Sequence, residues 1–159
     1  MAICMVENKR REAQLPFTPK VHSLIKTTDR HVAKKQYALA ITCYKKLISL
    51  EKRTYGPSYY FIAQDLQKLA EIYLLTNNFK QAEFYYKEAV AIEEKVLGKS
   101  HVDVARFLAD FAYLYSQERK YFNAINQYEK AKKIYSSHLG RDNIEVKRIE
   151  SRILDLAQR

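Results

Sequence analysis

The chain has 159 residues, 47% of them hydrophobic and 13% aromatic, which is enough for one domain with a continuous core. It contains only three Gly and three Pro, too few for the turns of a many-stranded sheet, so the composition argues against a mainly β architecture and favours helices. The formal net charge of +10 permits an acidic partner, and the placement of that charge decides where such a partner would bind.

The two cysteines, Cys4 and Cys43, lie far apart and cannot form the dense disulfide framework of a small secreted domain. The lack of such a framework favours a reducing compartment. The apolar run from Met1 to Val6 is interrupted by Glu7, and no later run approaches the ~18 apolar residues of a membrane span. We therefore expect a soluble, cytoplasmic protein without a membrane-spanning segment.

The predicted elements follow a flexible tail at residues 1–19, which contains the extended apolar segment Leu15-Pro16-Phe17. Thr18-Pro19 predicts the start of the first helix, because Thr caps helices well and Pro suits the first turn. In chain order we expect helices at residues 20–34, 37–54, 58–76, 79–97, 101–118, 121–138 and 142–158.

The helix ends carry their own signals. Ser100 precedes Asp103 by three residues and Asp142 precedes Glu145 by three, so both pairs resemble capping boxes. A glycine follows the second, fourth and sixth predicted helices, where it is expected to stop the helix in a left-handed conformation. These glycines are Gly56, Gly98 and Gly140.

The sequence repeats itself three times with a period of 42 residues. Each repeat has an aromatic residue, an alanine three places later, a tyrosine four further on, a Leu or Ala after that, and a closing glycine. The first four of these positions are Tyr37, Ala40, Tyr44 and Leu47; then Phe79, Ala82, Tyr86 and Ala89; then Tyr121, Ala124, Tyr128 and Ala131. The small residues allow close approach of helices and the tyrosine fills the remaining gap.

A second helical stretch lies upstream of each aromatic residue. It is clearest as Leu66-x-x-Leu69-Ala70-x-x-Tyr73, a spacing that places one apolar stripe on one helix face. The intervening turns are short, as in Thr76-Asn77-Asn78, and force the two helices of a unit to run antiparallel. Each repeat is therefore predicted to be a helix pair.

This order of residues resembles the tetratricopeptide repeat (TPR), over residues 20–158. The 42-residue period and the connection Leu97-Gly98-Lys99-Ser100-His101 resemble the kinesin light chain class of these repeats. The resemblance implies an all-α, right-handed superhelical solenoid of three TPR helix pairs, at about 20–56, 57–98 and 99–140, with a C-terminal capping helix at 142–158. It also implies a protein-interaction module or adaptor that holds a peptide or helix of a partner protein in a concave groove.

Two departures from the class limit what the resemblance implies. The glycine common in the turn within each pair is replaced by Lys35, Asn77 and Arg119. Where kinesin light chain repeats resemble a leucine-asparagine-asparagine-leucine-alanine run, this chain has Leu66-Gln67-Lys68-Leu69-Ala70. The groove asparagines are absent, so the ligand of the class is not carried over.

The resemblance implies that the first helix of each pair lines the groove with the face opposite its apolar stripe. Helical periodicity places one such stripe on each first helix, and we call these the groove stripes. Their residues are His22, Lys26 and Asp29; Gln64, Lys68 and Glu71; and Arg106, Asp110, Tyr113 and Gln117. The stripes are mixed in charge. Some of these residues also form i,i+3 pairs within their own helix, which is the competing interpretation.

Half of the excess positive charge lies in the last 41 residues, where ten basic residues face five acidic ones. We predict a second, electrostatic contact there, on a basic C-terminal surface. It comprises Lys130, Lys132, Lys133, Arg141, Lys147, Arg148 and Arg152. The alternative is that these residues only keep an exposed helix soluble. Among the tyrosines, Tyr59, Tyr60, Tyr85 and Tyr113 fall outside the repeating core positions and are candidates for exposed interface anchors.

No motif supports catalysis. The four histidines have no metal-ligand spacing, and the chain lacks a glycine-rich phosphate loop and a nucleophile-base arrangement. We expect no enzyme activity, no metal and no cofactor. The rival functions are a binder of nucleic acid, since a basic helical solenoid can follow a phosphate backbone, and a small TPR-type secretion chaperone. Nucleic acid is disfavoured because equivalent stripe positions change type, from Lys68 to Asp110 and from Glu71 to Tyr113. Self-association through a repeat edge is a further possibility.

Overall fold

The computed structural model describes residues 18–159, and within them the chain is all helical. It contains α2 (Pro19–Ala33), α3 (Tyr37–Tyr55), α4 (Tyr60–Leu75), α5 (Phe79–Leu97), α6 (Val102–Gln117), α7 (Tyr121–Leu139) and α8 (Ile144–Ala157). Each helix agrees with its expected range to within two residues at either end. The tail up to residue 17, with Leu15-Pro16-Phe17 and Cys4, lies outside the described residues.

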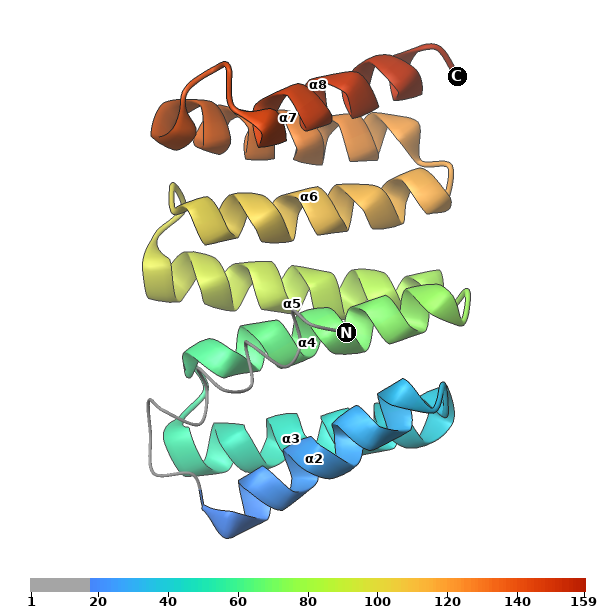
Figure 1. Ribbon diagram of the computed structural model, residues 1–159, viewed down its shortest axis with the longest axis vertical. Coiled ribbons are helices and arrows are strands. Elements are labelled where there is room, and N and C mark those ends of the chain that lie inside the picture. The colour runs from blue at the N-terminus through green and yellow to red at the C-terminus, as the bar shows by residue number, and fades with distance from the viewer. Residues whose placement is uncertain (1–17) are drawn as a thin grey trace.

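The helices form antiparallel pairs that stack along the long axis of the molecule (Figure 1). The pairs are α2 with α3, α4 with α5 and α6 with α7, and α8 packs on α7 at one end. The short turns within the pairs lie along one edge of the stack, and the longer connections with the glycines lie along the other. The fold is an all-α repeat solenoid, as the period predicted.

The core follows the repeat. Tyr44, Tyr86 and Tyr128 are buried, and the flanking alanines of all three repeats are inaccessible to solvent. Because these positions recur every 42 residues, α5 and α7 present the same small, aromatic, small surface to the helices around them, and α3 presents it with Leu47 at the third position. A continuous core results, to which each pair adds one layer.

The helix starts confirm one capping prediction and correct two. The Thr18 hydroxyl accepts a hydrogen bond from the Val21 amide, with Pro19 in the first turn. The expected boxes at Ser100 and Asp142 are wrong: α6 is capped by the His101 ring and α8 by Asn143. In both cases the cap lies one residue later than expected and accepts from the amide two residues on.

Two kinds of positive-φ residue end the helices. Lys35, Asn77 and Arg119 have φ of 55°, 56° and 60° and close the turns within the pairs. The glycines after α3, α5 and α7 have φ of 82° to 91° as expected, but their ψ of 148° to 163° is extended and not left-handed helical. That region is open almost only to glycine. The connections between pairs therefore need glycine more strictly than the turns within them.

Candidate partner-binding surfaces

The stripes on α4 and α6 converge above a buried tyrosine of α5. Burial raises the pKa of the Tyr86 hydroxyl, and the charges of Glu71 and Asp110, together with Tyr113, raise it further. These three residues come from two different first helices, and all were predicted to face the groove. The structure therefore brings the second and third stripes to one surface.

Asp110 is the most enclosed charge on this surface. Gln67 of α4 donates a hydrogen bond from its side-chain amide to the Asp110 carboxylate of α6. Burial raises the pKa of Asp110, whereas the positive charges of Arg106 and Arg152 and the bond from Gln67 oppose the rise. Gln67 is buried and the sequence did not mark it as a site residue. It fixes one stripe residue against the neighbouring repeat.

Arg152, which was predicted to lie on the basic C-terminal surface, contacts side chains beside the groove stripe of α6. Its guanidinium donates a 2.8 Å hydrogen bond to the Tyr128 hydroxyl and lies 5.8 Å from the ring centres of both Tyr113 and Tyr128. Tyr113 is 43% exposed, so the Arg152 contact leaves part of its ring available to a ligand. Arg152 also lies one 42-residue period after Asp110. The 42-residue register thus places α8 in the position of a further first helix, beside the stripe predicted on α6.

The remaining stripe residues are accessible to different degrees. Lys26 of α2 is exposed and His22 and Asp29 are half-buried; on α4, Gln64 and Lys68 are half-buried and Glu71 is exposed. On α6, Arg106 is half-buried and Gln117 is exposed. The stripe residues include both basic and acidic side chains.

The rest of the basic C-terminal surface is divided between paired and unpaired cations. Lys132 pairs with Glu129 at 2.8 Å, Lys147 with Asp142 at 3.3 Å, and Arg148 with Glu145 at 3.2 Å. Lys130, Lys133 and Arg141 form no ion pair with an acid of the described chain. The local pairs reduce the charge that an acidic partner would meet.

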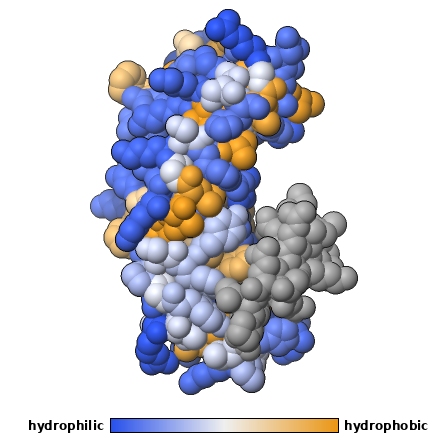
Figure 2. Space-filling view, turned by 90° about the vertical axis from the view of Figure 1, so that its left-hand side faces the viewer, coloured by the Kyte–Doolittle hydropathy of each residue, from blue (hydrophilic) through white to orange (hydrophobic). Residues whose placement is uncertain are grey.

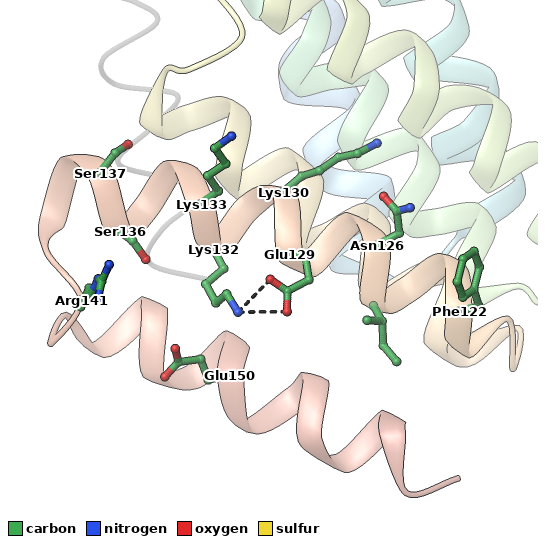
Figure 3. A pocket seen from close by; sticks show the side chains of 11 residues that line it. Phe122, Asn126, Glu129, Lys130, Lys132, Lys133, Ser136, Ser137, Arg141 and Glu150 are labelled. Carbon is green, nitrogen blue, oxygen red and sulfur yellow. Dashed lines mark hydrogen bonds and ion pairs between the residues drawn. The ribbon is translucent and has the colours of Figure 1, made fainter.

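A depression of about 980 Å³ runs along α7 and α8, and we call it the α7–α8 cleft. The unpaired cations Lys130, Lys133 and Arg141 are among the residues that line it. Its lining residues are Phe122, Ile125, Asn126, Glu129, Lys130, Lys132, Lys133, Ser136, Ser137, Arg141 and Glu150. Figure 3 shows the Lys132–Glu129 pair between the two helices, with Glu150 on α8 beneath it and Lys130 and Lys133 pointing away from α8.

An acidic side chain, Glu93, is buried inside the helical array. Glu93 of α5 is 0% exposed, and neither of its carboxylate oxygens has a hydrogen-bond partner in the described chain. Burial raises the pKa of Glu93 to about 7, Asp103 raises it and Arg106 lowers it. The sequence contains the signal, because Glu93 continues the buried spacing of Ala82, Tyr86 and Ala89 along α5.

The tyrosine candidates are mostly not exposed anchors. Tyr59 and Tyr60 are half-buried and each contacts the ring of Phe61. Tyr85 stacks on Tyr73 with ring centres 5.5 Å apart. Tyr113 alone among the four is exposed. Ring packing between neighbouring positions accounts for the others.

The edge that carries the glycine connections is mainly polar. Hydrophilic side chains cover most of it, and hydrophobic ones gather in a few patches (Figure 2). Within residues 18–159 no helix is long and apolar enough to cross a membrane, and no group of three or more His, Cys, Asp or Glu is placed to hold a metal ion.

Residues 31–95 match the tetratricopeptide repeat family. The chain therefore carries tetratricopeptide repeat sequence in this segment. No curated protein sequence matches it.

Several solved structures share the fold of this chain. BtubC (BKLC) from P. vanneervenii has a TM-score of 0.70 at 18% identity and covers 87% of this chain. A Podosopora anserina protein with nearly identical TPR-like repeats of kinesin light chain type has a TM-score of 0.71 at 16% identity, again over 87%. The present chain spans 54% of the first protein and 66% of the second.

A third structure is the TPR2B domain of yeast Sti1 in its complex with pHsp70, with a TM-score of 0.64 at 14% identity. The match covers 89% of this chain and 98% of that domain. At these identities the likeness establishes the TPR solenoid fold. Tetratricopeptide repeats are a protein-interaction fold, and the Sti1 domain is one that was solved in a complex with pHsp70.

Proposed function

We propose that this TPR protein holds a peptide or helix of a partner protein on the surface formed by the groove stripes of α4, α6 and α8. The observation that carries the proposal is the convergence of Glu71, Asp110, Tyr113 and Arg152 from three successive first helices. A segment lying across the helices would meet an acid, an aromatic ring and a cation in turn. Such a surface selects by charge pattern more than by net charge.

Arg152 and Asp110 support a ligand with charges of both signs. The guanidinium is held by Tyr128 and lies over Tyr113, so little side-chain entropy is lost when it meets a ligand carboxylate. Asp110 is held by Gln67 and would meet a ligand cation or hydrogen-bond donor. Both groups are therefore preorganised by contacts within the protein. Among residues 18–159 Cys43 forms no disulfide, which is consistent with a protein that works in the reducing cytoplasm.

The proposal is tested with two matched double variants. Lys68→Glu with Tyr113→Ala reverses one charge and removes one ring on the groove stripes. Lys80→Glu with Phe84→Ala makes the same two changes on α5, where both residues are exposed. Affinity capture with the intact chain and both variants, followed by mass spectrometry, identifies partners, and titration calorimetry with the purified partner measures the affinity.

We expect partners that are lost by the groove variant and retained by the α5 variant, with binding at least about tenfold weaker. Equal binding by both variants would refute the groove proposal. The nucleic-acid alternative is checked by fluorescence anisotropy with single-stranded RNA. Steep, salt-dependent micromolar binding would favour that rival.

A further inference from the structure

A buried carboxylate without a hydrogen-bond partner lies next to the groove stripe of α6. Glu93 of α5 is 0% exposed, and none of residues 18–159 donates a hydrogen bond to either of its carboxylate oxygens. A buried carboxylate normally has hydrogen bonds or a cation that offset its lost hydration. The charged groups that act on Glu93 are Asp103 and Arg106, at the N-terminal end of α6. The one cation among them belongs to the groove stripe.

Arg106 itself is a half-buried cation without an ion pair. Its guanidinium carbon lies 5.0 Å from the ring centre of the neighbouring Phe107, and no acid of residues 18–159 is within ion-pair distance of it. Two acids from different helices attract it: Glu93 on α5 and Asp110, one turn further along α6. The Asp110 carboxylate already accepts a hydrogen bond from Gln67. The guanidinium can therefore pair in either direction.

The combination of a buried acid and a groove cation occurs at one junction of the described repeats. In the first repeat the position of Glu93 is held by Glu51, which is also buried, but the following first helix has Gln64 in place of Arg106. In the third repeat the same position is held by Tyr135, and burial raises the pKa of its hydroxyl to about 12. Only the α5–α6 junction can therefore couple a buried carboxylate to the groove surface.

Ionisation of Glu93 changes which acid attracts the guanidinium. Burial raises the pKa of Glu93 to about 7, so the carboxyl loses its proton close to neutral pH. The resulting buried charge is costly unless a cation pairs with it, and a charge-assisted hydrogen bond from arginine is strong in such surroundings. While Glu93 keeps its proton this attraction is absent, and Arg106 is attracted by Asp110 and by solvent on the groove side.

We propose that Glu93 is a positioning residue of the groove and sets the direction of Arg106. When Glu93 is ionised, the guanidinium turns inward and pairs with it. When Glu93 is protonated, the guanidinium stays on the groove surface and binds a carboxylate of the partner, and the unpaired Arg106 of the structure corresponds to this form. The role toward a partner rests on the proposed function, whereas the movement of Arg106 does not. A carboxylate ligand that binds the protonated form better must bind more weakly as the pH rises.

Other ionisable groups face this junction. Tyr60 of α4 and Tyr135 of α7 both lie near Arg106, and burial raises the pKa of both hydroxyls, so both stay neutral near pH 7. The His101 ring nitrogen Nδ1 lies 3.5 Å from a carboxylate oxygen of Asp103. Because histidine is the side chain that ordinarily titrates near neutral pH, His101 is the group whose effect must be separated from that of Glu93.

The movement is measured in the full chain without any ligand. NMR follows the carboxyl carbon of Glu93 and the Nε–Hε group of Arg106 from about pH 5 to about pH 8.5. We expect both signals to titrate with a common midpoint at about pH 7. The Hε signal should move downfield as the pH rises, because it enters a charge-assisted hydrogen bond. This coincidence in the wild type tests the coupling without any variant.

Three variants assign the titration. In Glu93→Gln, which keeps the shape of the side chain, the Arg106 signal should no longer titrate. Glu94→Gln is the matched control on the same helix, because Glu94 is only half-buried, and it should keep the Arg106 titration. His101→Asn removes the second ionisable group and keeps a capping oxygen at the start of α6, so the titration should persist there too. Circular dichroism confirms that each variant remains folded.

The consequence for a partner is measured with benzoate, a carboxylate that stays ionised over this pH range, and with benzamide as its neutral analogue. Binding is followed by the same Arg106 signal. We expect the dissociation constant of benzoate to be at least about fivefold larger at about pH 8 than at about pH 6 in the wild type, and to change by less than about twofold in Glu93→Gln. The signal should respond to benzamide equally little at both pH values.

Several results would overturn the inference. These are different midpoints for Glu93 and Arg106, an Arg106 titration that survives in Glu93→Gln, and one that disappears in His101→Asn. Benzoate binding that is independent of pH while Arg106 titrates would refute the role toward a partner. Absence of benzoate binding at both pH values would count against Arg106 as a ligand-binding group and so against the groove proposal, whereas a common midpoint would still support Glu93 as the positioning residue.

Discussion

Helices α6 and α8 occupy the same place in successive repeats, but α6 lies between α5 and α7 whereas α8 packs mainly on α7. On the side facing the preceding pair the two helices are alike, and Val104 and Val146 are both buried. On the other side Leu108 is buried under α7 and Glu150 is exposed. The difference teaches that a repeat position is buried by its neighbours and not by its place in the period.

The junctions before these helices differ in charge as well. At the α5–α6 junction Glu93 is buried near Asp103 and Arg106. One period later the corresponding residues are Tyr135, Glu145 and Arg148, and the latter two form a 3.2 Å ion pair. At the α7–α8 junction an aromatic ring, Tyr135, therefore stands where the α5–α6 junction has a buried carboxylate, and the two remaining charged residues, Glu145 and Arg148, pair with each other.

The largest effect on the free energy of unfolding is expected when Leu108 of α6, which is buried, is replaced by the residue that α8 has at the corresponding position, Glu150. Leu108→Glu places a carboxylate under α7 and is expected to lower the free energy of unfolding by roughly 3 to 5 kcal/mol. The reciprocal change Glu150→Leu is expected to alter it by no more than about 0.5 kcal/mol, because that side chain is exposed. Urea unfolding monitored by circular dichroism measures both. Similar effects of the two changes would mean that α8 is covered in solution.

An intermediate effect is expected from the buried carboxylate of the interior junction. The folded chain keeps a proton on Glu93 up to about pH 7, whereas the unfolded chain loses it near pH 4.5. Unfolding therefore releases a proton between these values, and the contribution of Glu93 to stability falls as the pH rises through this window. Above pH 7 we expect Glu93→Gln to stabilise the fold by roughly 1 to 3 kcal/mol.

The measurement is urea unfolding of wild type and Glu93→Gln at several pH values from about 4 to about 8, a range that spans the ordinary pKa of a glutamate and the raised pKa of Glu93. The difference between the two proteins should grow with pH and level off above about 7. Glu94→Gln is the matched control, because Glu94 is only half-buried, and its difference from wild type should stay small. A difference that is constant with pH would show that Glu93 is ionised throughout.

The smallest effect on stability is expected in the turn that joins α6 to α7. Arg119 has φ of 60°, a conformation that costs a residue with a Cβ roughly 1 kcal/mol relative to glycine. Arg119→Gly is expected to raise the melting temperature by a few degrees. Arg119→Ala removes the same charge and keeps the strain, so it should give no such gain; an equal gain would assign the effect to charge.

The helices and their pairing were predictable because the pattern is local and repeats three times. The capping residues of α6 and α8 were not, since several polar residues stand near each helix start and only the backbone path selects His101 or Asn143. The same applies to Glu93. Its place in the buried stripe is visible along α5, but its loss of solvent depends on α6.

The candidate site was predicted in part. The stripes on α4 and α6 follow from helical periodicity, and the structure brings Glu71, Asp110 and Tyr113 to one surface. Arg152 was assigned to a basic C-terminal surface because its neighbours in sequence are basic. In the structure its guanidinium contacts Tyr113 and Tyr128, and side chains one or two residues apart on a helix point in different directions.

By itself the sequence determined the all-α class, the 42-residue unit, the helix pairs and the composition of each helix face. These follow from spacing within single helices, which short-range geometry sets. Only the tertiary structure decided which faces are covered, which side of α8 carries Arg152 and which carries Leu154, and that Glu93 is buried. These depend on what packs against each helix, and a repeated pattern does not distinguish a position inside the stack from the same position at its end.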